Sequence, residues 1–314
     1  MRVMRRLLTL IAAVLLAGVA ALAWSFTPAR LPVSGAALGE LPNASPPSGM
    51  TLSALPTGAM HAKAGFAYRG GSFSEPRDFG MTAVLVRHPR GDLLIDTGFG
   101  RDVAAQARRL PWLMRATSTY TAGVPAADQL ARGGYDVSRI AGLLITHAHW
   151  DHVSGVPSFR APVWMNASER RFVDGGAPMA ALMRSFVGAE VREYAWDGGP
   201  YLGFPRSHDW YGDGAIVLVP VPGHTPGSIA VFVTLPSGAR YAFIGDLVWQ
   251  REGLDLPAER PWLARWLVDD DAEGVRAGIS HMAAVHARFP EIVMIPAHDA
   301  RAAAELPAFP ASRG

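Results

Sequence analysis

The stretch THAHWDH at residues 146–152 holds four side chains of the kinds that bind divalent metals: His147, His149, Asp151 and His152. It directly follows the apolar run IAGLLI, which predicts a buried strand at residues 140–145. In a continuing strand His147 and His149 would point to one face, whereas Asp151 and His152 would point to opposite faces. The spacing therefore requires either a sharp loop that brings all four side chains together or a second metal position. Nitrogen and oxygen ligands this close together predict a metal site.

Three further candidate ligands follow apolar runs elsewhere in the chain. His224 lies in the turn PGHTPG after the run AIVLV, Asp246 directly follows the run YAFIG, and His298 follows the run EIVMI. Strand ends at one rim of a sheet bring together side chains that are distant in sequence, so we expect these three to complete the site. The remaining histidines are expected at surface or hydrogen-bonded positions: His61, His88, His208, His281 and His286.

This ordered set resembles the metallo-β-lactamase superfamily of binuclear metallohydrolases, whose HxHxDH signature stands at residues 147–152. The matching elements run from about Met81 to Asp299. The resemblance implies an α/β fold, an αββα sandwich, and two divalent metal ions. It assigns one metal to His147, His149 and His224, the other to Asp151, His152 and His298, and a bridging position to Asp246.

The resemblance also gives a role to Asp96, in the stretch LIDTG. There the carboxylate would accept a ring N–H from a ligand histidine and fix its tautomer. The alternative is that Asp96 only starts a turn at Thr97-Gly98.

The expected chemistry is hydrolysis by a hydroxide that two metal ions generate near neutral pH, while one ion polarises the substrate oxygen. Asp151 and Asp246 are the expected catalytic carboxylates, and Asp151 is best suited to orient the hydroxide and move its proton. Zn²⁺ suits these ligands best, with Mn²⁺, Fe²⁺ and Co²⁺ as alternatives. The sequence has no G-x-S-x-G elbow, P-loop or G-x-G-x-x-G fingerprint after a strand, so no competing nucleophile or nucleotide motif is present.

Asp246 bears on the substrate, because true β-lactamases of the superfamily generally have Cys or Ser near that place. The chain looks more like the acyl-homoserine lactonase and glyoxalase II-like group. In the lactonases an aromatic hydroxyl follows the bridging aspartate by three residues, whereas this chain has Trp249, which offers a single N–H donor. Trp249 is therefore a candidate substrate-binding residue, with simple packing as the alternative.

Two aromatic segments could surround the substrate. Residues 247–271 contain three tryptophans among leucines and predict either a lid or apolar wall for an acyl chain, or a helix packed on the edge of the sandwich. Residues 112–120 form a second aromatic region that could face the same cleft.

Short apolar runs alternating with helical patterns predict strands covered by helices on their outer sides, an αββα sandwich in a single domain. The expected strands are residues 81–87 and 92–95, which form a hairpin, and 140–145, 162–165, 215–219, 229–235, 241–244 and 291–295. The expected helices are residues 102–110, 126–132, 167–173, 179–187 and 272–289.

The N-terminus predicts export. Arg2, Arg5 and Arg6 precede an uncharged apolar run at residues 7–23 that ends in a small-x-small pattern, typical of a signal peptide cleaved after Ala23. The alternative is an uncleaved anchor attached to the inner membrane through residues 7–23. Either way we expect a periplasmic or secreted protein. Residues 24–58, rich in Pro, Gly and Ser, are expected to be a linker or extended entry segment before a hydrolase domain at 59–314.

Composition excludes several classes of protein. The 314 residues include no cysteine, which rules out disulfides, thiolate zinc sites, iron–sulfur clusters and a cysteine nucleophile. Without the three N-terminal arginines the chain has 26 basic and 27 acidic residues, a net charge of −1. A near-neutral chain lacks the dense positive face that nucleic acid requires, so we expect a small-molecule substrate and no nucleic-acid partner.

Three functions therefore compete. The first is an exported binuclear hydrolase of small lactones or esters. The second is a phosphodiester, sulfate ester or thioester hydrolase; the charged esters would need a cation beside the site, for which Arg251 and Arg260 are candidates. The third is a catalytically inactive metal-binding protein of the cell envelope that keeps the fold.

Overall fold

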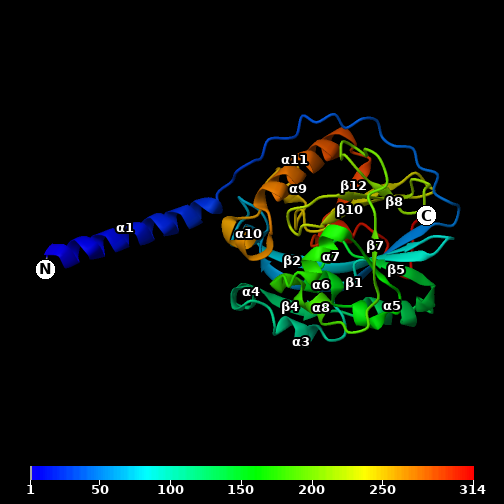
Figure 1. The fold of residues 1–314 in the computed structure, drawn as a ribbon, viewed down its shortest axis with the longest axis horizontal. Helices are drawn as coiled ribbons and strands as arrows, with labels where there is room; N and C mark the ends of the chain where they lie inside the picture. Colours follow the sequence, from blue (N-terminus) through cyan, green and yellow to red (C-terminus); the bar gives the residue numbers. More distant parts are fainter. Residues whose placement is uncertain (1) are drawn as a thin grey trace.

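A computed structural model of the chain describes residues 2–314. Two β-sheets face each other with helices on their outer sides, and one long helix, α1 (Arg2–Ser25), extends away from this body (Figure 1). Buried side chains from both sheets, such as Val86 and Val231, share one apolar cluster, so the sheets pack directly on each other. The expected αββα sandwich is confirmed.

The first sheet has seven strands, antiparallel in its first half and parallel in its second. In spatial order they are β4 (Thr119–Ala122), β1 (Thr51–Lys63), β2 (Pro76–Arg87), β3 (Asp92–Ile95), β5 (Ile140–Leu144), β6 (Val163–Asn166) and β7 (Val191–Tyr194). The second sheet has five strands: β12 (Ile292–Ile295), β11 (Arg240–Phe243), β10 (Ile229–Thr234), β9 (Ile216–Pro220) and β8 (His208–Asp209).

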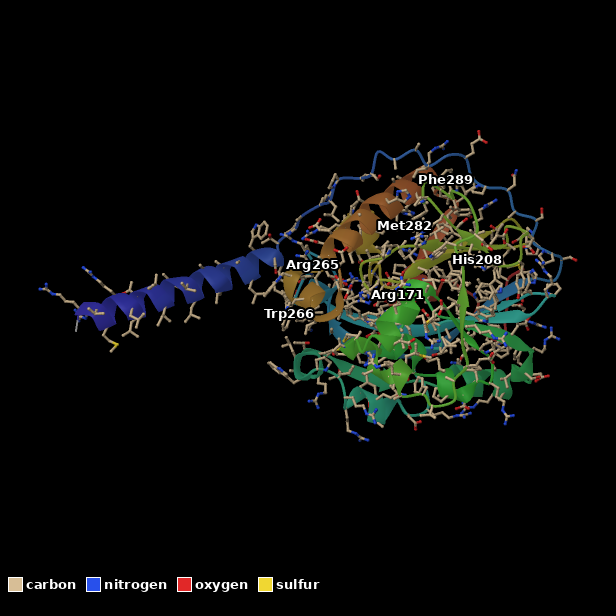
Figure 2. The ribbon with its side chains drawn as sticks, viewed as in Figure 1. Arg171, His208, Arg265, Trp266, Met282 and Phe289 are labelled. Atoms are coloured by element: carbon tan, nitrogen blue, oxygen red, sulfur yellow. The ribbon has the colours of Figure 1, made fainter. Side chains whose placement is uncertain are left out.

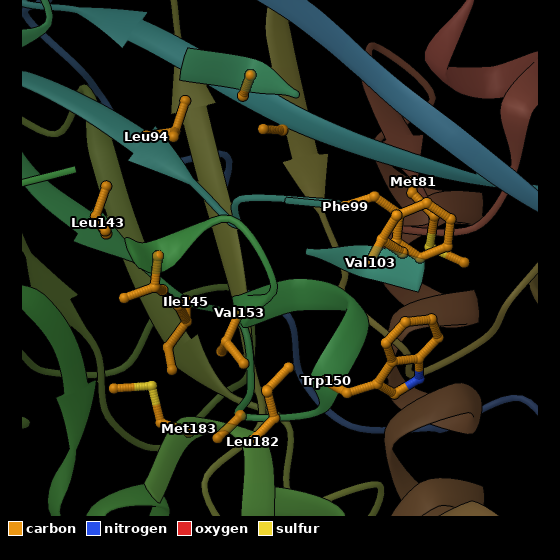
Figure 3. Packing of buried hydrophobic residues seen from close by; sticks show 14 of the residues in the cluster. Met81, Leu94, Phe99, Val103, Leu143, Ile145, Trp150, Val153, Leu182 and Met183 are labelled. Carbon is orange, nitrogen blue, oxygen red and sulfur yellow. The ribbon is translucent and has the colours of Figure 1, made fainter. Parts of the chain in front are cut away.

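Short helices cover the outer face of the first sheet, where residues such as Phe99, Trp150 and Val153 form a second apolar cluster (Figure 3). The helices on this side are α2 (Ala64–Ala67), α3 (Val103–Ala107), α5 (Ala126–Arg132), α6 (Trp150–Val153), α7 (Ala167–Asp174) and α8 (Ala181–Arg184). The helix α4 (Trp112–Thr117) and the 3₁₀ turns η1 (Val137–Arg139), η2 (Val156–Ser158) and η3 (Pro178–Ala180) lie between these elements in the chain.

The second sheet is covered mainly by α11 (Ala272–Arg288). Its buried residues Val275, Ile279 and Met282 recur at helical spacing and pack on the sheet, as the sequence pattern predicts. Three short helices complete the chain: α9 (Glu252–Asp255), α10 (Trp262–Val268) and α12 (Ala300–Ala303). Asp299 caps α12 by accepting hydrogen bonds from the backbone N–H groups of Arg301 and Ala302.

The expected boundary between linker and domain at residue 58 is wrong, because β1 begins at Thr51. Leu52 and Leu55 are completely buried, and β1 pairs with β2 along its whole length. Pro56 and Gly58 concealed the strand in the sequence, since both are typical of loops. In the sheet they mark a register shift, beyond which β1 gains β4 as a second neighbour.

The rest of the entry segment runs along the body. Leu31, Leu38 and Leu41 pack against the apolar cluster beneath α11, and the backbone N–H of Ser34 donates to the carbonyl of Ser280. The segment therefore covers part of the second helical layer (Figure 1).

Thr57, at the register shift in β1, provides a test of the revised boundary. Its fully buried hydroxyl donates to the Met81 carbonyl and accepts from the Phe99 N–H, both at 2.7 Å. Thr57→Val leaves both backbone groups without a partner, so the free energy of unfolding should fall by about 1–3 kcal/mol. Denaturant unfolding measures this change, with Thr57→Ser, which keeps the hydroxyl, as the control. Equal midpoints for Thr57→Val and the parent would contradict this role of β1.

Candidate metal centre

The motif loop, residues 146–152, turns sharply where β5 ends. Asp96, at the end of the neighbouring strand β3, adopts a positive φ of 53° and accepts hydrogen bonds from the Thr146 N–H (2.7 Å) and hydroxyl (2.8 Å). The backbone then enters α6 at Trp150, with His149 at the N-cap position. A loop and a helical turn, rather than a continuing strand, therefore position the histidines and the aspartate of the motif.

The structure brings all seven predicted ligand side chains together, in three overlapping groups whose ligand atoms lie within 4.8 Å of one another. The groups are His147, His149 and His224; His147, His152 and Asp246; and Asp151, His152 and His298. Within the described residues 2–314, none of the five other histidines belongs to these groups.

Asp246 lies between the two outer groups. Its carboxylate oxygens are 3.1 Å from His298 Nε2, 3.2 Å from His152 Nε2 and 3.3 Å from His224 Nε2. One carboxylate in contact with imidazoles of both groups has the geometry that a shared ligand requires.

The donor atoms of the cluster fit a divalent cation. All seven side chains are buried, yet His147 Nε2, His224 Nε2 and Asp246 Oδ1 make no hydrogen bond within the described structure. Buried polar atoms are nearly always paired, because leaving one unpaired costs about 1–3 kcal/mol. A cation at this point would satisfy several such atoms at once.

Burial and neighbouring charges set the ionisation of these groups. Burial, reinforced by neighbouring histidines, holds the pKa of His147 and of His149 well below the ordinary value, so both rings are neutral near pH 7. Burial alone would raise the pKa of Asp246, but His298 and His152 hold that pKa well below its ordinary value. For His152, His224 and His298 burial alone would lower the pKa, but nearby carboxylates, Asp246 among them, raise it. A bound cation would require all five imidazoles to be neutral around the Asp246 anion.

Three histidines are oriented by hydrogen bonds from Nδ1, which turn Nε2 toward the cluster. His152 donates to Asp96 Oδ2 at 2.8 Å, His224 to Asp269 Oδ1 at 2.8 Å, and His298 to the Gly80 carbonyl at 3.0 Å. Asp96 therefore lies where the resemblance implies and also anchors the motif loop.

Glu169, in the first turn of α7, is a positioning residue that the sequence did not suggest. Its buried carboxylate accepts hydrogen bonds from the Ala148 N–H (2.6 Å), the Thr225 hydroxyl (2.6 Å) and the Gly227 N–H (3.0 Å). Ala148 separates two ligand histidines, and the other two donors follow His224 in the turn PGHTPG. One carboxylate thus joins the two ligand-bearing loops. Asn166 and Glu169 have the spacing of an ordinary helix cap, which concealed this role.

Asp269 and Arg260 form a second support that the sequence did not show. Asp269 holds His224 and accepts from Arg260 Nη2 at 2.5 Å, while Arg260 Nη1 donates to the Asp246 carbonyl at 2.7 Å. Arg260 is buried, so it is not available to bind an anionic substrate. Arg251, the other candidate cation, pairs with Glu305 at 2.8 Å.

A mostly apolar cavity that opens to solvent adjoins the cluster; the empty space there, including solvent at its mouth, is about 840 Å³. Its lining includes Leu263, Ala264, Leu267 and Val268 of α10, Leu113 and Met114 of α4, and Met60, Phe66, Phe79 and Met81. In the described residues the lining contains no lysine, arginine or tyrosine. The segment 247–271 therefore supplies an apolar wall of the cavity, one of the roles expected for it, and contains the short helices α9 and α10.

Trp249 also lines this cavity, but its single donor is already engaged. The indole N–H donates to Asp246 Oδ2 at 2.8 Å. The ring packs edge-on against Phe79 with centroids 5.7 Å apart, and the Arg260 guanidinium lies 5.0 Å from the ring centroid on the indole face. Trp249 therefore orients the central carboxylate and offers only its ring to a bound molecule.

Residues 77–309 match the family model of the metallo-beta-lactamase superfamily, so the chain belongs to this superfamily of metal-dependent hydrolases. A probable metallo-hydrolase of Mycobacterium tuberculosis is 30% identical over 234 residues, covering 69% of this chain and 73% of the relative. An N-acyl homoserine lactonase of Azorhizobium caulinodans is 27% identical over 175 residues, 48% of this chain and 59% of the relative.

Among solved structures, an N-acyl homoserine lactone hydrolase with bound N-hexanoyl-L-homoserine has a TM-score of 0.66 at 15% identity. The alignment covers 84% of this chain and 98% of that chain. At this identity the likeness shows a shared fold.

Glu169→Gln tests the link between the two ligand-bearing loops. Glutamine keeps one acceptor oxygen, but its NH2 group replaces the other and faces a donor of the loops instead of accepting from it. We therefore expect zinc affinity to fall about 10- to 100-fold while the fold is retained. Competition with a chromophoric chelator measures the affinity, and circular dichroism checks the fold. Glu193→Gln, at an exposed position on β7, is the matched control. Unchanged zinc affinity in Glu169→Gln would show that the loops are held by other contacts.

Proposed function

We propose that this chain hydrolyses the carbonyl bond of a neutral lactone or ester that carries an apolar acyl chain. The observation that carries this proposal is the cavity beside the histidine and aspartate cluster, whose lining within residues 2–314 is mostly apolar and contains no lysine or arginine. An acyl chain gains free energy by leaving water for such a cavity, whereas a phosphate or sulfate group would find a counter-charge only at the metal ions and none in the cavity wall.

In this proposal two divalent metal ions, best matched by Zn²⁺, occupy the cluster. His147, His149 and His224 would hold one, Asp151, His152 and His298 the other, and Asp246 would contact both. Such ions supply an activated water near neutral pH and polarise the carbonyl oxygen of the substrate.

The protein's own side chains have separate tasks beside these ions. Asp151 lines the cavity, and its Oδ2 lies 3.3 Å from His298 Nε2. A carboxylate at the wall of the cavity can take up a proton at one oxygen and return it to the leaving alcohol. Trp249 holds Asp246 through its N–H and presents its ring to the acyl part of the substrate.

The similar proteins support a lactone over a charged ester. One curated relative is an N-acyl homoserine lactonase, and a structural neighbour holds the product of N-acyl homoserine lactone hydrolysis. The candidate cations for a phosphate or sulfate, Arg260 and Arg251, are both engaged in ion pairs. A thioester offers the same electrophilic carbonyl and therefore belongs in the test panel.

We also propose that the hydrolase domain functions outside the cytoplasm. The support is α1, 24 residues long, with a mean hydropathy of 2.5 and no part of its apolar window buried. Cleavage after Ala23 and retention as an anchor both place the rest of the chain, from Trp24 onward, on the exported side.

A hydrolysis panel tests the function directly. The metal-loaded protein should contain about two metal ions per chain and hydrolyse N-acyl lactones, with kcat/KM rising by up to about fourfold for each added methylene until the cavity is full. His149→Ala should lose metal and turnover together, because it removes a proposed ligand. Faster turnover of a bis-aryl phosphate or a thioester than of every lactone would reject the proposed substrate class. Metal content without turnover of any substrate would favour the inactive metal-binding protein.

Trp249→Phe separates the donor of the indole from its ring. The variant keeps an aromatic wall but removes the hydrogen bond to Asp246, so we expect kcat to fall about tenfold with KM little changed. Steady-state kinetics on a lactone measure both constants. Trp196→Phe, outside the cavity, is the matched control. A rise in KM with unchanged kcat would show that Trp249 acts in substrate binding.

A further inference from the structure

Exposed tryptophans gather on the face of the body from which α1 leaves. Trp24 is 66% exposed, Trp112 71%, Trp262 50% and Trp266 66%. They come from the end of α1, from α4 and from α10, which lie at one end of the body (Figure 1). Trp266 lies beside the base of α1 (Figure 2). We call these four residues the aromatic face.

The end of α1 is fixed to the body beside α10. Arg69 donates to the carbonyls of Trp24 and Thr27, each at 3.1 Å, and its guanidinium lies 4.6 Å from the centroid of the Trp24 ring. Arg69 also pairs with Glu259, which in turn pairs with Arg265 of α10. These buried contacts set where α1 stands relative to α10, so the aromatic face has a defined position at the base of the helix.

The same helices have one side in the cavity and the other on this face. In α10, Leu263 and Leu267 line the cavity, while Trp262 and Trp266 point outward and stack with centroids 6.5 Å apart. In α4, Leu113 and Met114 line the cavity and Trp112 is exposed. The cavity therefore lies between two helices that both carry exposed tryptophan.

Basic residues lie close to Trp112 in the chain. Arg108, Arg109 and Arg115, in and before α4, are exposed and have no acidic partner within the part of the chain that the structure describes. Tryptophan is enriched at the level of lipid headgroups, and arginine is attracted to anionic lipids.

We propose that the aromatic face rests on the lipid bilayer in which α1 is anchored, so that the cavity takes long-chain acyl substrates from the membrane. The bilayer is the occupant because α1, which is long and apolar enough to span it, leaves the body at this face. The choice of substrate rests on the proposed lactone or ester hydrolysis, whereas the membrane contact does not.

The absence of cysteine allows a direct test with single labels. Trp266→Cys, Trp112→Cys and Val137→Cys each carry a polarity-sensitive fluorophore in the full chain, reconstituted in vesicles of phosphatidylcholine and phosphatidylglycerol. Val137 is the control, because it is an exposed apolar residue of η1. η1 contacts α5, and α5 lies at the other end of the body from α1 (Figure 1). Labels at 266 and 112 should shift to the blue and be quenched by a lipid-borne quencher, whereas the label at 137 should not. Identical behaviour at all three positions would overturn the membrane contact.

Kinetics separate this inference from the proposed function. The double variant Trp262→Ser/Trp266→Ser should lose about tenfold in kcat/KM for a long-chain lactone dissolved in the vesicles, because less apolar surface enters the bilayer. Its hydrolysis of a short-chain, water-soluble lactone should match that of the parent. Equal rates on the vesicle-borne lactone would overturn uptake from the membrane. If the parent protein hydrolysed neither lactone, the proposed function would fail, and the labels would still decide the membrane contact.

Discussion

The structure depends on the burial of five imidazoles and two carboxylates at one point where loops from both sheets meet. Buried polar atoms without partners are costly, and here several ligand atoms face one another instead of hydrogen-bond partners. A cation removes that cost, so metal binding and the order of the surrounding loops are energetically linked. The contacts of Asp96, Asp269 and Glu169 serve the same end, since each holds a ring or a loop in the geometry that a cation needs.

Much of the sandwich could be predicted because its elements carry strong local patterns. The buried strand at residues 140–144 was predicted from its apolar run, and the helix at 272–288 from the helical spacing of the apolar residues that it buries. β1 was missed because Pro56 and Gly58 are typical of loops, although in the sheet they form an irregularity beside β4. Local composition does not show that β2 and β4 pair with this segment. The strand could therefore be recognised only in the folded sheet.

The metal site divides in the same way. The seven ligand candidates were visible because metal binding restricts residue type and because each follows an apolar run. Their supports were not visible, since the partners of a carboxylate are set by tertiary structure. Glu169 has a helix-cap spacing from Asn166, and Asp269 begins the run DDD at 269–271, and neither pattern shows what the carboxylate contacts. Trp249 was recognised as a candidate, but only the structure shows its donor directed at Asp246.

These supports leave few polar groups free for a substrate. The Trp249 N–H, the Arg260 guanidinium and the Glu169 carboxylate, which another hydrolase could direct at its substrate, all hold ligands or ligand-bearing loops here. For the lactone or ester substrates that we propose, polar contacts at the reacting carbonyl would then come chiefly from bound metal, and discrimination among substrates from the apolar wall. Each added methylene changes the binding free energy only modestly, so apolar contacts distinguish acyl chains of different length weakly. They distinguish headgroups hardly at all. On the proposed function such a site suits a set of related acyl compounds. If the aromatic face rests on a bilayer as we propose, the concentration of those compounds in that bilayer would contribute to selectivity as much as the cavity does.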